Sequence, residues 1–70
     1  MKESQKILKV ALDVPLDRLF DYLNNGEAFK VGQYVKVSFG SRVLMGVVCG
    51  FANDSLLAED KLKKIIHAEP

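Results

Sequence analysis

Runs of apolar residues, separated by residues that favour turns, divide the chain into short segments. The segment 7–13 is nearly all apolar, which predicts a strand in the middle of a sheet. The segments 33–39 and 43–51 are also rich in apolar and β-branched residues, and a glycine-containing turn at 40–42 separates them. This arrangement predicts two further strands joined as a hairpin.

The segment between the first two predicted strands has a helical spacing instead. Its apolar residues recur at i, i+3, i+4 and i+7, and they are Leu16, Leu19, Phe20 and Leu23. The spacing predicts a short helix over 18–24 with Asp17 as its N-cap. In this helix Asp21 points nearly opposite the apolar face and Tyr22 lies to its side.

The rest of the pattern completes the predicted fold. Gly46 and Gly50, within the third predicted strand, indicate bulges or close backbone contacts. The segment 62–68 fits a helix end or a last strand, and the strand is favoured. Residues 1–6 are polar and predict a flexible tail before one small domain over 7–70. We therefore expect an α+β, β-rich fold: an SH3-like or OB-like partly open barrel of about four strands, with one short helix after the first strand.

Composition restricts the classes of function. The chain has 70 residues, 49% of them hydrophobic and 27% charged, which suits one small globular domain. A single cysteine cannot form an internal disulfide, and no apolar run is long enough for a signal core or a bilayer span. These features predict a cytoplasmic protein, or a piece of one, with no membrane partner. The net charge of +1 argues against a broad basic surface, so a nucleic acid would bind at a small pocket.

The sequence shows no pattern typical of an enzyme. It contains no P-loop and no run of metal ligands. Cys49 and His67 have no partners at metal-ligand or catalytic spacing, so Cys49 is interpreted as a small core residue and His67 as an exposed strand end. A binding module without a metal or cofactor is therefore favoured.

The most distinctive candidate site is Phe20-Asp21-Tyr22, a carboxylate between two aromatic residues. Aromatic rings stack on bases, and a carboxylate accepts hydrogen bonds from a sugar hydroxyl or a base N–H. Each residue also has a plainer interpretation, since Asp21 fits a solvent-facing helix position and Phe20 fits the core. Tyr22, beside the apolar face, is better placed to offer its ring and hydroxyl to a ligand.

The order of several short segments along the chain resembles one family. The segments are VALDVPL at 10–16, FDY at 20–22, VGQYVKVSFG at 31–40, GVV at 46–48, LKKII at 62–66 and EP at 69–70. They are similar to the first subdomain of the N-terminal 3′-DNA-end-binding domain of primosomal protein N′, the bacterial replication-restart helicase PriA.

The resemblance implies a module that recognises the 3′-terminal nucleotide of the nascent leading strand at a stalled replication fork. It implies a pocket formed by Phe20, Asp21, Tyr22, Gly40 and Lys63. ATP and zinc would be bound only by the rest of such a protein, through which other primosome proteins and single-strand-binding proteins are possible partners. A free 3′-OH is a donor that Asp21 can accept, whereas a phosphate in its place would be repelled.

Two of the residues that the resemblance implies also have other interpretations. Gly40 allows close approach of a sugar or base, and it equally suits a hairpin turn. Lys63 can neutralise the last phosphate, but Lys61 or Lys64 could take its place, and all three also fit a solvated face. The alternative function is protein binding by a small SH3-like module.

Overall fold

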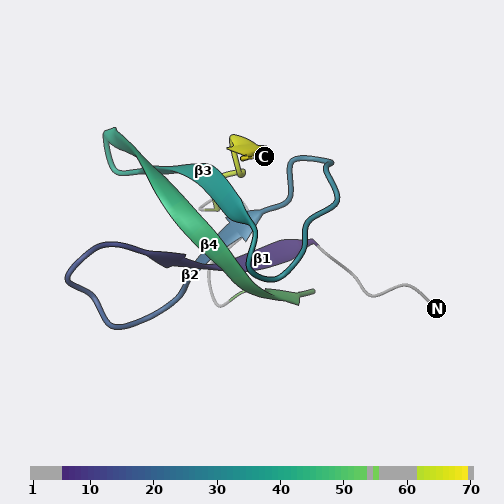
Figure 1. The fold of residues 1–70 in the computed structure, drawn as a ribbon, viewed down its shortest axis with the longest axis horizontal. Coiled ribbons are helices and arrows are strands. Elements are labelled where there is room, and N and C mark those ends of the chain that lie inside the picture. The colour runs from purple at the N-terminus through teal and green to yellow at the C-terminus, as the bar shows by residue number, and fades with distance from the viewer. Residues whose placement is uncertain (1–5, 54, 56–61, 70) are drawn as a thin grey trace.

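The computed structural model describes residues 6–53, 55 and 62–69, and these residues form a single antiparallel sheet (Figure 1). Its strands are β1 (Ile7–Leu12), β2 (Phe20–Leu23), β3 (Tyr34–Phe39), β4 (Arg42–Ala52) and β5 (His67–Ala68). They lie in the order β2-β1-β4-β3-β5, so the long β4 runs between β1 and β3. The β-rich prediction is confirmed, and the predicted strands correspond to β1, β3, β4 and the shorter β5.

The short helix predicted over 18–24 is wrong, because residues 20–23 form β2. β2 pairs with β1 along its whole length, from Val10 opposite Phe20 to Ile7 opposite Leu23. So short a helix has little stability of its own, whereas pairing with β1 satisfies backbone groups of both strands. The N-cap role of Asp17 falls with the helix. Within the described residues, no helix is long and apolar enough to span a membrane.

The hydrophobic core lies on one face of the curled sheet, which we call the inner face. Alternate residues of each strand point to this face, as the pleat of a strand requires. The cluster consists of Leu8, Val10, Phe20, Tyr22, Phe29, Val35, Val37, Val48 and Ile65. The intervening positions form the outer face, which carries Asp21 and its cross-strand neighbour Lys9.

The C-terminal segment contacts both edges of the sheet. The N–H of Leu23 in β2 donates to the carbonyl of Lys63 at 2.8 Å, and the N–H of Ile65 donates to the carbonyl of Leu23 at 2.9 Å. On the other side, the N–H of Ile66 donates to the carbonyl of Lys36 in β3 at 2.8 Å. A single parallel bridge between Leu23 and Lys64 joins β2 to this segment, so in the described part of the chain the sheet stays open.

Both glycines of β4 occupy the special positions that the sequence predicts. A Cβ atom on Gly46 would lie 2.5 Å from Cγ1 of Val10 and 2.8 Å from Cδ2 of Leu12, so this glycine permits a close contact between β4 and β1. Gly50 lies opposite Lys9 beside a bulge, because Val10 pairs with Val48 and leaves Cys49 as the extra residue.

Candidate functional site

β2 separates the residues of the Phe20-Asp21-Tyr22 motif between the two faces of the sheet. Phe20 and Tyr22 point to the inner face, and Asp21 points to the outer face. The sequence placed Asp21 away from the apolar residues, which the strand also does. It placed Tyr22 beside the apolar face, and there the structure differs because alternation in a strand turns Tyr22 inward.

Tyr22 is a core residue with an internal hydrogen-bond partner. Its side chain is 5% exposed, and its hydroxyl donates to the carbonyl of Ser38 in β3 at 2.8 Å. Burial raises the pKa of the Tyr22 hydroxyl above its ordinary value of 10.0. Tyr22 therefore joins β2 to β3 across the inside of the curl, and its ring is not available as an exposed stacking surface.

Phe20 belongs to a small aromatic and cationic group at the hairpin end of the sheet. Its ring meets the ring of Phe39 edge to face, with a centroid distance of 5.2 Å. The guanidinium carbon of Arg18 lies 4.6 Å from the centroid of the Phe20 ring. Phe20 is only 9% exposed, and Arg18 lies over its ring.

Asp21 carries the polar chemistry of the motif. Its Oδ1 lies 2.8 Å from the Nζ of Lys9, and its Oδ2 accepts a hydrogen bond from the hydroxyl of Ser55. Lys9 is the direct cross-strand partner of Asp21 in the β1–β2 ladder, which places their side chains on one face. These two contacts orient the carboxylate, and the Asp21 side chain is mostly covered, with 13% of it exposed at the surface.

The charge state of Asp21 follows from these neighbours. Partial burial raises its pKa, but hydrogen bonds from Lys9 and Ser55 and the charges of Lys9 and Arg18 outweigh that effect. The net result is a pKa below the usual value of 3.8, so Asp21 is ionised at neutral pH. An ionised carboxylate accepts hydrogen bonds and donates none.

Gly40 begins the turn between β3 and β4, next to the aromatic group. Its φ is +61°, and Phe39 and Arg42 on either side of the turn are cross-strand partners. A glycine with positive φ at the first position of a two-residue hairpin is typical of a type II′ turn. The turn interpretation of Gly40 is therefore confirmed. Gly40 directly follows Phe39, the residue that contacts Phe20.

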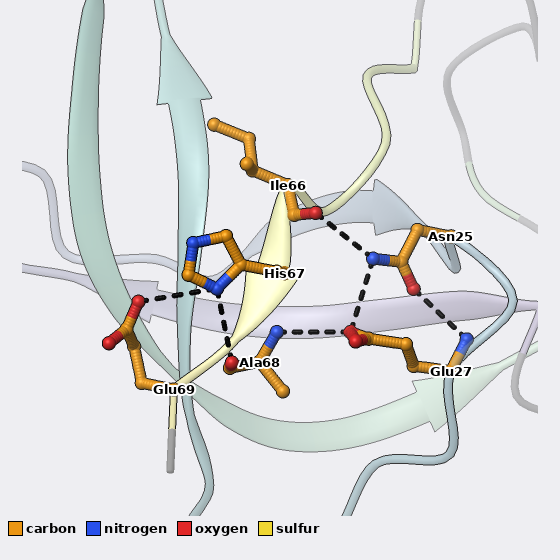
Figure 2. Close-up of polar contacts among 6 residues, drawn as sticks. All are labelled: Asn25, Glu27, Ile66, His67, Ala68 and Glu69. Carbon is orange, nitrogen blue, oxygen red and sulfur yellow. Dashed lines mark hydrogen bonds and ion pairs between the residues drawn. The ribbon is translucent and has the colours of Figure 1, made fainter.

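Lys63 is fixed by its backbone and has an exposed side chain. Its carbonyl accepts from Leu23 in β2, two residues beyond Asp21. Figure 2 shows how the following segment is held: Asn25 Nδ2 donates to the carbonyl of Ile66 at 3.2 Å, and Glu27 Oε1 accepts from the N–H of Ala68 at 3.0 Å. Lys64 is also exposed, and Lys61 lies outside the described residues.

The structure thus assembles the five predicted residues only in part. Asp21 is accessible on the outer face, Gly40 lies beside the Phe20–Phe39 pair, and Lys63 adjoins the end of β2. Sequence reasoning missed four neighbours, which are Lys9, Arg18, Phe39 and Ser55. A lysine inside the apolar run 7–13 was a usable signal for an outward-facing position, but its pairing with Asp21 depends on strand register.

Among the described residues, no three His, Cys, Asp or Glu side chains come together in a group that could hold a metal ion. Cys49 is exposed on β4 rather than buried in the core, so its interpretation as a core residue is wrong. The bulge beside Gly50 explains this position, because Cys49 is the extra residue of β4.

Comparison with known proteins finds a similarity to a protein family and to a curated relative. Residues 9–69 match the family described as the 3′DNA-binding domain (3′BD) of PriA. The chain is also 44% identical over 62 residues to the replication restart protein PriA of Haemophilus influenzae, and this match covers 87% of the chain and 8% of that protein. The chain therefore spans less than a tenth of the length of the curated relative that it matches.

Proposed function

The chain belongs to the 3′DNA-binding domain (3′BD) family, and on that premise we propose that it binds the 3′-terminal nucleotide of a DNA strand. The observation that carries the proposal is the ionised, oriented and accessible carboxylate of Asp21. A free 3′-OH donates a hydrogen bond to such a group. A 3′-phosphate or a continuing phosphodiester brings negative charge against it and is repelled.

Asp21 has capacity left for a ligand. A carboxylate offers about four lone-pair sites on its two oxygens. Lys9 occupies one oxygen and Ser55 the other, with one contact each. Both contacts fix the orientation of the carboxylate before a ligand arrives, which reduces the entropy that is lost on binding.

The backbone of Asp21 adds a donor and an acceptor beside the carboxylate. The N–H and C=O of Leu23 bond to Lys63 and Ile65, on the side of β2 away from β1. Backbone groups alternate along an antiparallel strand, so those of Asp21 point to the same side of β2 as those of Leu23. No described residue bonds to them there. A base or a sugar on this side can therefore meet an N–H, a C=O and a carboxylate within one residue.

We propose that this module works as part of a longer replication-restart protein of the PriA type. The proposed role is to position a restart helicase on a fork by capturing the 3′ end of the nascent leading strand. ATP, zinc, other primosome proteins and single-strand-binding proteins would engage other parts of that longer protein. A cytoplasmic location follows from this proposed role.

The test compares two ends of the same oligonucleotide. Fluorescence anisotropy should show tighter binding of a strand with a 3′-OH than of the same strand with a 3′-phosphate. Asp21→Asn should weaken binding of the 3′-OH strand about tenfold to a hundredfold, as expected when a charge-assisted hydrogen bond is lost, and should reduce the difference between the ends.

Asp17→Asn is the matched control, because it removes the same charge from an exposed residue of the loop before β2. It should leave the end preference unchanged. Equal affinity of the unmodified protein for both ends would overturn the proposal. Binding of neither strand would favour the protein-binding alternative.

A further inference from the structure

The chain contains two arginines, Arg18 and Arg42, and the fold brings both to the same aromatic pair. Arg18, in the loop between β1 and β2, lies over the ring of Phe20. Arg42, at the start of β4, is the cross-strand partner of Phe39. Phe20 and Phe39 touch edge to face, so the two arginines flank one contact.

Neither arginine is used by the protein for an ion pair with a described residue. Both are exposed, and the nearby carboxylate of Asp21 is bound by Lys9 instead. The guanidinium carbon of Arg18 lies over the Phe20 ring, 4.6 Å from its centroid. A guanidinium has five N–H donors, more than a contact with one ring face can use.

The 3′ end of a DNA strand needs two different kinds of contact. Its terminal hydroxyl is neutral and suits a carboxylate, but the phosphates that precede it must avoid that carboxylate and suit cations. Arg18 lies close enough to Asp21 for its charge to act on that carboxylate. Arginine in particular matches phosphate geometry, because its planar donors can bind two phosphate oxygens at once.

We propose that Arg18 and Arg42 bind the backbone phosphates that precede the terminal nucleotide, while Asp21 takes the terminal hydroxyl. The inference rests on the proposed function and adds two positioning residues to it. The pair provides affinity that does not depend on end chemistry or sequence, since phosphates are the same in every strand. The Phe20–Phe39 contact brings the backbone positions of the two arginines to the same end of the sheet.

The test measures the salt dependence of binding for Arg18→Gln, Arg42→Gln and the double variant, with a single strand that carries a free 3′-OH. Each phosphate contact contributes about −0.7 to the slope of log affinity against log salt for a single strand. Each single variant should therefore flatten the slope by about 0.7 and the double variant by about 1.4. The affinity ratio between the unmodified protein and each single variant should fall about two- to threefold between 50 and 200 mM salt.

Lys30→Gln is the control, because Lys30 is an exposed cation in the loop before β3, at the opposite end of that strand from the hairpin. It should leave the slope unchanged. Thermal melts must show that the variants fold. If the glutamine variants do not fold, Arg18→Lys and Arg42→Lys, which keep the charges, are used in their place.

The outcomes separate the two proposals. If the unmodified protein prefers a 3′-OH and the arginine variants keep its slope, the phosphate assignment is overturned and the end-binding function stands. If the variants flatten the slope and the ratio of 3′-OH to 3′-phosphate affinity is unaffected, the inference is supported. If the unmodified protein shows no end preference, the proposed function fails, whatever the slopes are.

Discussion

The inner and outer faces of β2 differ although the residues concerned are neighbours in sequence. Phe20 and Tyr22 on the inner face are covered by other side chains and make their polar or aromatic contacts inside the protein. Asp21 on the outer face is oriented by Lys9 and Ser55 and remains accessible. A motif that looks like one ligand-binding unit is thus divided between the core and a polar position on the outer face. Substitutions on the two faces should therefore have different consequences.

The largest expected effect is on the inner face. Phe20→Ala removes a buried ring and its contact with Phe39, and it should lower the free energy of unfolding by about 3–5 kcal/mol. Small domains have only about 5–15 kcal/mol in total, so much of the protein should be unfolded. Thermal melts provide the measurement. Leu19→Ala is the control, because Leu19 is 46% exposed and its truncation should cost little. A folded Phe20→Ala protein that has lost only DNA binding would break the comparison between the faces.

Gly46 and Gly50 allow the inner and outer faces of the sheet to be compared on β4. Gly46→Ala would place a methyl group against Val10 and Leu12, so it should cost about 1–3 kcal/mol of stability through overpacking. Gly50→Ala meets no atom within 4 Å and should be nearly neutral. Urea denaturation of the two variants gives the difference directly. Equal stability of the two variants would show that β1 relaxes at Gly46 without cost.

The hairpin could be predicted from sequence because its signals are local. Phe39-Gly40-Ser41-Arg42 carries its own turn chemistry, and β-branched residues on both sides identify β3 and β4. β2 could not be predicted in this way. Phe20 and Tyr22 alternate with Asp21 as a strand requires, but Phe20 also completes a helical spacing with Leu16 and Leu23. The edge of β1 with which residues 20–23 pair favours the strand over the helix. A short stretch of sequence does not show that this edge is available.

The candidate site was predictable to a similar extent. Asp21 was identified from its chemistry, and its position away from the core follows from either a helix or a strand. Its partners Lys9 and Ser55 depend on register and on a loop that returns to β2. The convergence of Arg18 and Arg42 depends on the contact between Phe20 and Phe39, which lie far apart in sequence. Such long-range contacts leave no periodic signal.

A smaller effect is expected for the hydroxyl of Tyr22. Tyr22→Phe keeps the ring in the core but leaves the carbonyl of Ser38 without this donor. The free energy of unfolding should fall by about 1 kcal/mol, the usual net value of one hydrogen bond. Tyr34→Phe is the control, because Tyr34 is 56% exposed and should show almost no change in the same melts. Loss of 3′-end binding by a fully stable Tyr22→Phe protein would place the hydroxyl on the ligand side after all.

The smallest expected effect on stability comes from the outer face, where Asp21 pairs with Lys9. The pKa of Asp21 is lower in the folded protein than its ordinary value of 3.8, so ionised Asp21 stabilises the fold above that pH. This contribution is lost as the pH falls below 3.8 and through the folded-state pKa. Lys9 is 35% exposed, so solvent weakens the pair and its contribution should stay below about 1 kcal/mol. Urea denaturation should therefore show Asp21→Asn slightly less stable than the unmodified protein at pH 6, with the difference shrinking toward acid pH. Asp17→Asn, which removes the same charge from an exposed residue, is the control in the same experiment. A deficit of Asp21→Asn that grew on acidification would mean that the folded protein favours the protonated carboxyl. The outer face would then not present the anion on which the proposed end recognition depends.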